Sequence, residues 1–318
     1  MVEYRAIRHG EWDQAMALWT GVFGVGGWLF QTLSDSTAGR SLEHTRVAVE
    51  DGRIVSAVDV FIRDLRDASG QPVRVGGIGS VATYDDARRH GHSGRLLEQA
   101  IELMEREGCA WSFLFTGTHH HYERYGWART PLTMRQGKVR TEFPVRDEEY
   151  RVALLTSDTW PLEAMAQIYE VFNATRPLSH VRNKTCWDIA TRTRLEQSER
   201  KTLGAWSGGE LVAYLSATLG QNEGSVDEAC ALPGHSGALT NLFVAAAEHA
   251  KSRGYSTMSF LLPSEPGIDG AMSQVCEGFE EHQRGHTMSR PIRGGFTMEQ
   301  VKELFAAPGR QHYELDNF

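Results

Sequence analysis

Residues 73–127 constrain the fold of this 318-residue chain more than any other stretch. Residues 73–83 are rich in β-branched residues and glycine, which predicts a strand. A polar loop with arginines and glycines follows, and from Ser93 apolar residues recur at helical spacing until Gly108 ends the helix. The apolar run Trp111–Phe115 predicts a second strand, parallel to the first because a helix connects the two. The unit is therefore strand, basic glycine loop, helix and parallel strand.

The loop in this unit suits an anionic ligand. Glycine lets the backbone approach a ligand closely, and successive N–H groups at the start of a helix form an anion-binding concavity. Arg88 and Arg89 add positive charge beside Gly91 and Gly94, which favours a pyrophosphate over a single carboxylate. An ordinary capped helix after a loop with two solvated arginines is the alternative, because short glycine motifs are weak evidence.

The same residues carry a resemblance to a known family. Residues 88–93, RRHGHS, resemble the R/Q-x-x-G-x-G/A pyrophosphate loop of the GNAT acetyltransferases, and residues 81–83 look like the splayed strand before it. Residues 122–127, YERYGW, are similar to the family's Y-x-x-x-G-F/W segment. Two departures are that Ser93 fills the second small-residue slot and that no asparagine precedes the Tyr122 helix. The resemblance implies an α+β fold with a mixed, mostly antiparallel sheet, a central parallel pair, flanking helices and bound acetyl-CoA.

The resemblance also implies roles for individual residues. Backbone N–H groups on the splayed strand would stabilise the oxyanion that forms during acetyl transfer. Tyr122 would give a proton to the leaving thiolate, because the tyrosine pKa of about 10 exceeds the thiol pKa of about 8.5. A core tyrosine on a short helix is the alternative. The residues expected to bind the cofactor are Val81, Ala82, Thr83, Arg88, Arg89, His90, Gly91, Ser93 and Gly94.

The proton acceptor for the incoming amine is less well defined by the sequence. The last residues offer three carboxylates, at Glu314, Asp316 and the C-terminus of Phe318. In Eis-like GNAT enzymes the C-terminus enters the site of the first domain, so the resemblance implies a catalytic carboxylate at Phe318. The alternating residues before Phe318 predict a strand paired into a sheet, and a frayed end is the alternative. His119, the first of three successive histidines, is a candidate proton carrier beside the substrate. We expect no metal, because adjacent histidines on a helix cannot all face one ion.

The residues that bind the acceptor substrate are expected near the N-terminus. Residues 24–37 are glycine-rich and aromatic, which predicts a mobile wall over a pocket with Trp28 and Phe30 as substrate-binding residues. A surface loop with two tucked aromatic side chains is the alternative. The acceptor expected from the family is a primary amine of a small molecule or peptide.

A partial repeat predicts a second copy of the unit. The residues GHSG at 91–94 recur at 234–237, followed again by a predicted helix and strand. At the same offset the loop arginines become Ala231 and Leu232, and Gln274 stands where the tyrosine would be. We therefore expect a degenerate second copy without the phosphate-binding arginines or the proton donor.

The repeat predicts two domains, with a catalytic N-terminal unit at residues 1–140 and a degenerate unit at residues 145–318. Such tandem units resemble the Eis-like acetyltransferases, which usually continue into a sterol-carrier-like third domain; residues 297–318 predict only one helix and a short tail, so we expect no such domain here. Mycothiol synthase is the other tandem type of this length. Its active copy is the second one, so the degenerate second loop argues against that assignment.

Composition limits the classes of partner. The net charge of −8 and the pI of about 5.9 disfavour a nucleic-acid partner and mildly favour a cationic acceptor, although ordinary solubility charge explains them equally well. No apolar run approaches about 18 residues and the N-terminus has no signal-like pattern, so we expect a cytoplasmic protein with no membrane partner. Four widely spaced cysteines predict reduced thiols.

The expected function is acetyl transfer from acetyl-CoA to an amine by direct attack in a ternary complex. A silent acyl-CoA-binding sensor or scaffold is the alternative, as is a protein-interaction module built from two inactive copies. The sequence is compatible with a homo-oligomer. It leaves open the acceptor, the general base and the acyl-chain preference.

Overall fold

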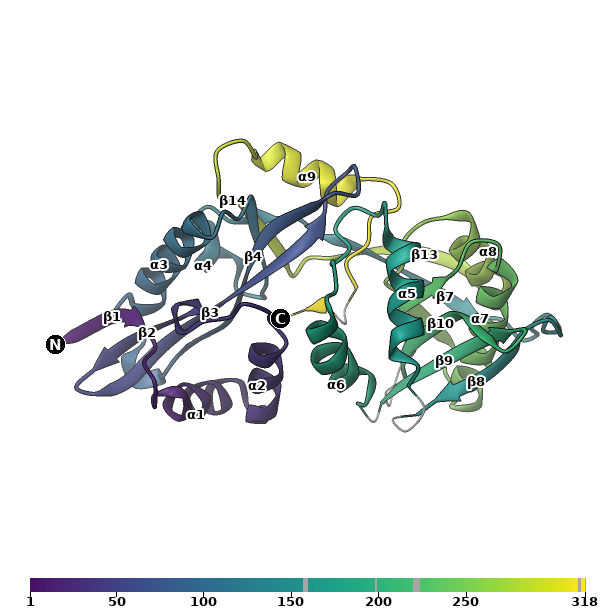
Figure 1. The fold of residues 1–318 in the computed structure, drawn as a ribbon, viewed down its shortest axis with the longest axis horizontal. Helices are drawn as coiled ribbons and strands as arrows, with labels where there is room; N and C mark the ends of the chain where they lie inside the picture. The colour runs from purple at the N-terminus through teal and green to yellow at the C-terminus, as the bar shows by residue number, and fades with distance from the viewer. Residues whose placement is uncertain (157–159, 198, 220–223, 314–315, 318) are drawn as a thin grey trace.

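The computed structural model describes residues 1–318 except 157–159, 198, 220–223, 314–315 and 318. In this part of the chain the strands form two seven-stranded sheets (Figure 1). The first sheet has the order β1 (Val2–Ala6), β2 (Thr45–Glu50), β3 (Arg53–Arg66), β4 (Pro72–Thr83), β5 (Trp111–Phe115), β14 (Thr287–Pro291) and β6 (Ala128–Arg129). The second has the order β13 (Cys276–Arg284), β7 (Leu132–Val139), β12 (Thr257–Phe260), β11 (Gly224–Ala231), β10 (Glu210–Leu219), β9 (Arg200–Ser207) and β8 (Arg151–Leu155).

Helices flank both sheets. The α-helices are α1 (Trp12–Phe23), α2 (Gly27–Asp35), α3 (His92–Arg106), α4 (His119–Glu123), α5 (Leu162–Asn173), α6 (Arg192–Leu195), α7 (Ser236–Ser252), α8 (Pro266–Val275) and α9 (Met298–Ala306). Short 3₁₀ turns form at η1 (Leu42–His44) and η2 (Asp85–Ala87), and a π-helical turn forms at η4 (Cys186–Thr191). No helix of the described residues has both the length and the apolar character needed to span a membrane.

Each sheet contains one parallel pair among antiparallel neighbours. β4 pairs with β5 in parallel, and β11 pairs with β12 in the same way. Each parallel pair is joined through a helix, α3 or α7, as a parallel connection requires. The predicted fold class, two mixed and mostly antiparallel sheets with flanking helices, is therefore confirmed.

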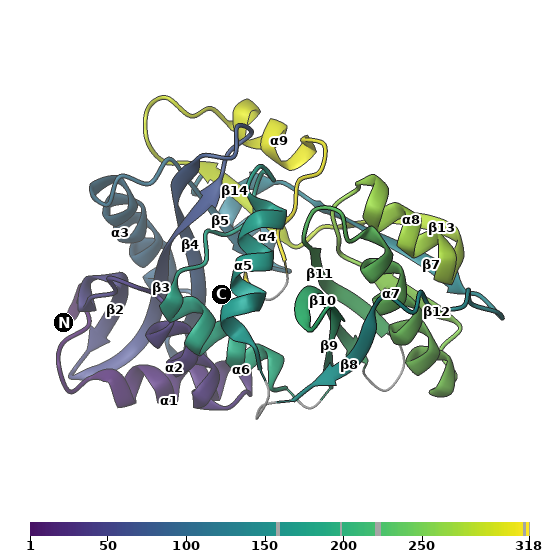
Figure 2. The same cartoon turned by 45° about the vertical axis from the view of Figure 1, so that its right-hand side comes forward.

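The two sheets exchange strands, which the sequence did not predict. β7 follows the first unit in the chain but lies in the second sheet between β12 and β13. β14 follows the second unit but lies in the first sheet between β5 and β6. Figures 1 and 2 show β7 extending into the second sheet. Residues 1–140 and 145–318, the two expected domains, therefore do not each contain a complete sheet.

The helix α3 shows how the apolar pattern positions the loop before it. Leu97, Ala100 and Met104 on its inner face have no solvent exposure and pack on the first sheet. Burying such side chains stabilises the fold by roughly 1.5–3 kcal/mol for each large one. Because α3 is fixed along its length, its N-terminus is held at the end of β4.

The glycine-rich segment at residues 24–37 differs from the expectation of a mobile wall. Residues 27–35 form the helix α2, and Phe30 and Leu33 on one face are buried. Phe30 contacts Trp19 and Phe23 with ring-centroid distances of 5.5 and 5.7 Å. Gly27 at the first position is the one glycine within α2, so packing of the following apolar residues against α1 is sufficient to hold the helix.

Candidate active site

The central feature of the first sheet is an opening between β4 and β5. The two strands pair only from Val75 to Ile78 on β4, whereas β4 continues to Thr83 alongside β3 alone. Beyond Ile78 the edge of β4 that faces β5 therefore has no strand partner among the described residues. The N–H groups of residues 79–83 that point away from β3 have no partner strand at this edge within the described part of the chain, whereas the carbonyls of Ala82 and Thr83 accept side-chain hydrogen bonds from Ser56 and Arg88. These residues include Val81, Ala82 and Thr83, as the sequence predicted for the splayed strand.

A β-bulge lies where the two strands separate. The register of β3 and β4 shifts between Ala57 and Asp59, so that Ser80 and Val81 together face one residue of β3. Ser80 has a φ of 51°, an uncommon value for a residue with a side chain. The Ser80 carbonyl accepts a 2.7 Å hydrogen bond from the indole nitrogen of Trp19, which is fully buried in α1. The bulge is therefore held in place by a side chain far away in the sequence.

The loop before α3 has the backbone shape of an anion site. Arg89 and Gly91 have φ values of 68° and 81°, whereas Arg88 before them is extended. Left-handed residues ahead of a helix can turn successive N–H groups toward one point. The first N–H groups of α3, at His92 and Ser93, have no acceptor within the helix because they begin it. The loop can thus bind phosphate oxygens through its backbone.

The arginines of the loop are on the surface. Arg88, Arg89 and His90 are exposed, and Arg88 forms a 2.8 Å ion pair with the exposed Asp85. Such a pair contributes little in water, so Arg88 is able to exchange Asp85 for a phosphate. Gly94 has a different role, because a Cβ there would lie 1.8 Å from the Tyr125 hydroxyl. The absence of a side chain at Gly94 lets the segment after α4 pack against the first turn of α3.

Tyr122 lies on α4, close to the end of β5. Its side chain is 8 % exposed and packs edge-on against Trp127 with a ring-centroid distance of 6.3 Å. Burial raises the pKa of Tyr122 to about 12, and the Thr116 hydroxyl partly opposes this shift. Tyr122 therefore keeps its proton at any physiological pH, as a proton donor must. Its neighbour His121 approaches the Ser93 hydroxyl at 3.4 Å, which places α4 beside the glycine loop.

The three predicted substrate-binding residues do not lie together at this opening. His119 donates a 2.6 Å hydrogen bond to the Gly285 carbonyl, so it links α4 to the turn before β14. Trp28 is 56 % exposed and Phe30 is part of the core. α2 does border a hollow of about 810 Å³, but it does so through Gln31, Ser34 and Asp35.

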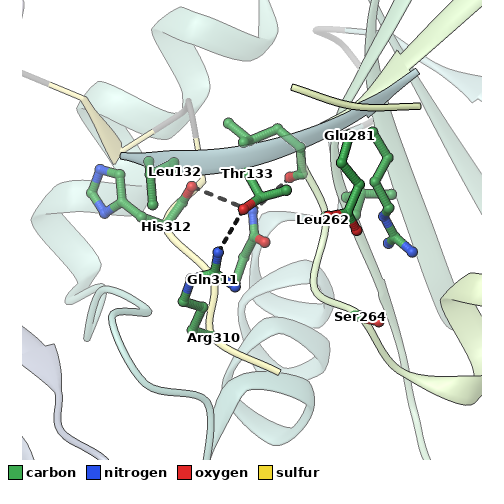
Figure 3. A pocket seen from close by; sticks show the side chains of 10 residues that line it. Leu132, Thr133, Leu262, Ser264, Glu281, Arg310, Gln311 and His312 are labelled. Carbon is green, nitrogen blue, oxygen red and sulfur yellow. Dashed lines mark hydrogen bonds between the residues drawn. The ribbon is translucent and has the colours of Figure 1, made fainter. Parts of the chain in front are cut away.

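The segment after α9, here called the tail, runs between the two sheets. The Gln311 side chain donates to the Leu261 carbonyl just beyond β12, at 2.6 Å. His312 stacks on Phe115, the last residue of β5, with a ring-centroid distance of 5.7 Å. Figure 3 shows Arg310, Gln311 and His312 around Thr133 of β7. The tail thus reaches the end of β5, where the opening begins.

The described part of the tail differs from the predicted strand. His312 and Tyr313 are buried but belong to no strand, because their polar groups bind side chains and loops rather than a sheet edge. The Tyr313 hydroxyl, for example, donates to the Asn173 side chain at 3.0 Å. Phe318, the predicted catalytic carboxylate, lies outside the described residues.

The second unit has lost the anion site more completely than the sequence indicated. In the first unit residues 84–90 separate β4 from Gly91, whereas only Leu232 and Pro233 separate β11 from Gly234. Ala231, which the offset aligned with Arg88, is the last residue of the strand. The loop is therefore shortened and not merely substituted.

An acidic segment, residues 147–150, covers the start of α7 in the second unit. A Cβ at Gly237 would lie 3.0 Å from the Tyr150 ring and 3.6 Å from the Asp147 carboxylate. The Asn241 side chain holds this segment, because it accepts a hydrogen bond from the Asp147 N–H at 3.0 Å and donates one to the Asp147 carbonyl at 2.8 Å. A carboxylate thus lies close to the place that a pyrophosphate would occupy.

Comparison with known proteins agrees with this geometry. Residues 3–130 match the family described as acetyltransferase (GNAT) domain. Residues 3–130 are a GNAT domain. No curated protein sequence matches the chain significantly.

Solved structures resemble the chain over nearly its whole length. A probable N-acyltransferase from Enterococcus faecalis V583 is 15 % identical, with a TM-score of 0.71 over 92 % of this chain and 73 % of that one. Eis1 from Mycobacterium abscessus is 15 % identical, with a TM-score of 0.64 over 92 % and 74 %. A tandem GNAT protein from the clavulanic acid biosynthesis pathway is 14 % identical, with a TM-score of 0.50 over 93 % and 100 %. The TM-scores show a shared tandem GNAT fold, and at identities this low they show the fold alone.

Proposed function

We propose that the chain is an N-acetyltransferase that moves an acetyl group from acetyl-CoA to a primary amine of a small molecule or peptide. The observation that carries the proposal is the convergence of three features at one edge of the GNAT domain: the opening between β4 and β5, the left-handed loop before α3 and the buried Tyr122 on α4. Acetyl-CoA would supply the acetyl group as an activated thioester.

The residues of the opening would divide the work among them. The first N–H groups of α3 would bind the pyrophosphate, with Arg88 and Arg89 adding charge-assisted bonds. The N–H groups of residues 81–83 would stabilise the oxyanion formed when the amine attacks. Tyr122 would then protonate the leaving sulfur. Direct attack by the amine in a ternary complex needs no covalent intermediate on the protein.

For the proton of the attacking amine we propose the carboxylate of Phe318 as acceptor. The described residues support this through the path of the tail, since His312 packs on Phe115 at the opening. A carboxylate there would also favour a positively charged acceptor, which the net charge of −8 would attract from solution.

A catalytically silent sensor of acyl-CoA would need the loop but not Tyr122. Release of thiol from acetyl-CoA in the presence of a panel of primary amines distinguishes the two, because only the enzyme releases thiol in an amine-dependent way.

Calorimetry with acetyl-CoA should give one site per chain, and joint Arg88→Ala and Arg89→Ala substitutions should weaken binding at least about 10-fold. Arg95→Ala, on the exposed side of α3, is the matched control.

Two equivalent acetyl-CoA sites would contradict the assignment of the second unit as degenerate. Binding without amine-dependent thiol release, over amines that include polyamines, aminoglycosides and lysine peptides, would favour the sensor instead.

A further inference from the structure

One group of potential metal ligands among the described residues lies outside the GNAT site. It consists of His180, Cys186 and Asp316, all at most 5 % exposed. Their ligand atoms lie within 4.8 Å of one another. The sequence offered no signal for this group, because its members come from three segments with no recognisable metal-binding spacing.

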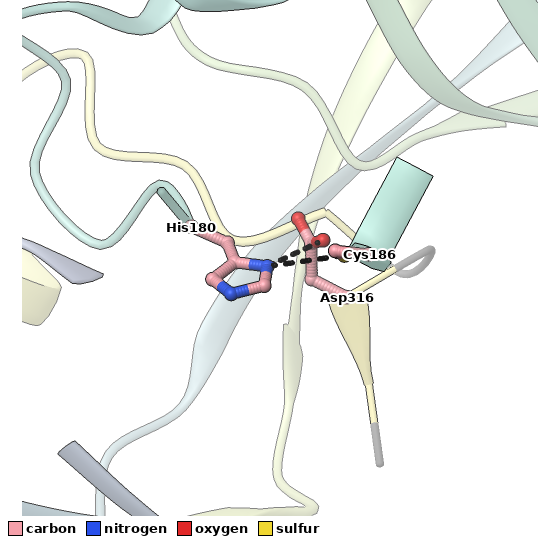
Figure 4. A group of neighbouring side chains, drawn as sticks. All are labelled: His180, Cys186 and Asp316. Carbon is pink, nitrogen blue, oxygen red and sulfur yellow. Dashed lines mark hydrogen bonds and ion pairs between the residues drawn. The ribbon is translucent and has the colours of Figure 1, made fainter. Parts of the chain in front are cut away.

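The distances in this group suit a tetrahedral ion. The His180 Nδ1 atom lies 3.2 Å from Asp316 Oδ1 and 3.9 Å from Cys186 Sγ. Zinc bonds of about 2.0–2.3 Å at tetrahedral angles separate neighbouring ligand atoms by about 3.3–3.7 Å. Figure 4 shows the carboxylate and the sulfur both facing the same imidazole nitrogen. A thiolate, an imidazole and a carboxylate together match zinc better than magnesium or calcium.

Each ligand is held in place by its own local structure. His180 forms a bridge to Leu65 at the end of β3, and Cys186 begins η4 with its N–H bound to the Asn183 side chain at 2.9 Å. Arg182 binds both oxygens of Asp316, at 2.7 and 3.0 Å. Such supporting bonds orient metal-binding carboxylates. π-Helical turns such as η4 also occur frequently at functional sites.

A fourth ligand has space to approach from one side. His180 and Cys186 line a hollow of about 180 Å³ together with Ser36, Thr37 and Asn183. A hollow of this size holds water molecules, and a water is the usual fourth ligand where a protein supplies three.

We propose that His180, Cys186 and Asp316 bind one zinc ion, which ties the tail to the junction of the two units. The ion joins the segment beside β3, the turn η4 and the tail residue Asp316, and so holds the tail against both sheets. Its binding is independent of acetyl transfer, and its test needs no substrate.

The test uses full-length protein without an affinity tag, stripped with a chelator and then titrated with zinc or cobalt(II). We expect one equivalent of tightly bound zinc, a higher melting temperature and a thiolate-to-cobalt charge-transfer band. Cys186→Ser should abolish the band, and Asp316→Asn should weaken zinc binding at least about 10-fold. Cys109→Ser, in the core of the first sheet, should keep the band.

Binding to the successive histidines His119, His120 and His121 would produce no thiolate band, so adventitious sites are separated from the proposed one. If the Cys186 variant fails to fold, protection of the wild-type Cys186 thiol from alkylation by one equivalent of zinc replaces it as the readout. Absence of stoichiometric zinc binding, a band unchanged in folded Cys186→Ser, or unaltered alkylation of Cys186 would overturn the proposal and leave a hydrogen-bonded group without an ion.

Discussion

The indole nitrogen of Trp19 donates a 2.7 Å hydrogen bond to the carbonyl of Ser80, 61 residues further along the chain. Trp19 lies on α1 and Ser80 lies in the bulge where β4 separates from β5. The bond ties the helical layer to the backbone that we propose as the oxyanion site. Ser80 has a left-handed φ that costs energy, and the buried partner offsets part of this cost.

We predict that Trp19→Phe reduces turnover more than it reduces affinity for acetyl-CoA. Loss of the donor frees the bulge, and a small shift of the N–H groups at residues 81–83 weakens transition-state binding. Turnover should fall by roughly 10-fold or more, and stability by about 1–3 kcal/mol because the residue is fully buried. Steady-state kinetics and urea unfolding measure the two effects.

Trp12→Phe is the control for this prediction, because its indole donates to the side chain of Gln31 near the surface. It should leave turnover close to the wild-type value. Equal losses of turnover in the Trp12 and Trp19 variants would contradict a specific role for the bulge.

The exchange of β7 and β14 predicts that the two units are not separable. A fragment of residues 1–140 lacks β14, so β5 and β6 lose the strand between them. A fragment of residues 145–318 lacks β7 in the same way. We expect each fragment alone to aggregate or remain unfolded, because an unpaired central strand exposes both apolar and hydrogen-bonding groups.

Co-expression of the two fragments should restore a soluble complex. When the chain is cut between β7 and β8, the first fragment carries β7 and can complete the second sheet, and the second fragment carries β14 and can complete the first sheet. Size-exclusion chromatography and circular dichroism report the outcome. A fragment of residues 1–140 that unfolds cooperatively as a monomer would show that the exchange is dispensable.

Local patterns in the sequence were sufficient for the GNAT fold but not for this exchange. The helix α3 and the strand β5 follow from residue spacing that any isolated segment displays. Which sheet receives β7 depends on pairing with strands more than a hundred residues away, such as β12. Neighbouring strands in sequence usually pair, and β7 and β14 depart from that tendency.

The candidate site also combines features that the sequence indicates with features that it does not. The loop before α3 and Tyr122 are local motifs, and the structure brings both to the opening. The contacts of Trp19 with Ser80 and of His312 with Phe115 join distant segments, so no spacing rule could indicate them. Phe30 lies in the core, and the sequence could not indicate this because an aromatic ring suits a pocket wall and a helix core equally well.

The proposed role of Phe318 predicts that the position of the terminal carboxylate matters more than the aromatic ring. Deletion of Phe318 moves the carboxylate by one residue, about 3.5 Å, whereas Phe318→Ala keeps it in place. We expect turnover to fall roughly 10²-fold for the deletion and much less for the substitution. Affinity for acetyl-CoA should stay unchanged in both.

Both variants keep Gln311, Tyr313 and Asp316, which anchor the tail, so folding should be preserved and melting temperatures should match. Wild-type turnover in the deletion variant would show that the proton acceptor lies elsewhere.

The last prediction concerns Tyr122 and its proton. Tyr122→Phe keeps the buried ring but removes the donor, so turnover should fall roughly 10²-fold while the KM for acetyl-CoA barely changes. Tyr150→Phe, beside the shortened loop of the second unit, is the matched control and should leave turnover unaffected.

The pH dependence gives a second and independent check on the same residue. Because burial raises the pKa of Tyr122 from 10 to about 12, its protonated form persists well above neutral pH. Turnover should therefore show no loss from Tyr122 ionisation below about pH 10. The folded-state pKa exceeds the unfolded one, so the stability linked to this proton is complete below about pH 10 and is lost as the pH rises toward 12. Tyr122→Phe should lack that loss, whereas an unchanged turnover in this variant would assign the proton to water or a histidine.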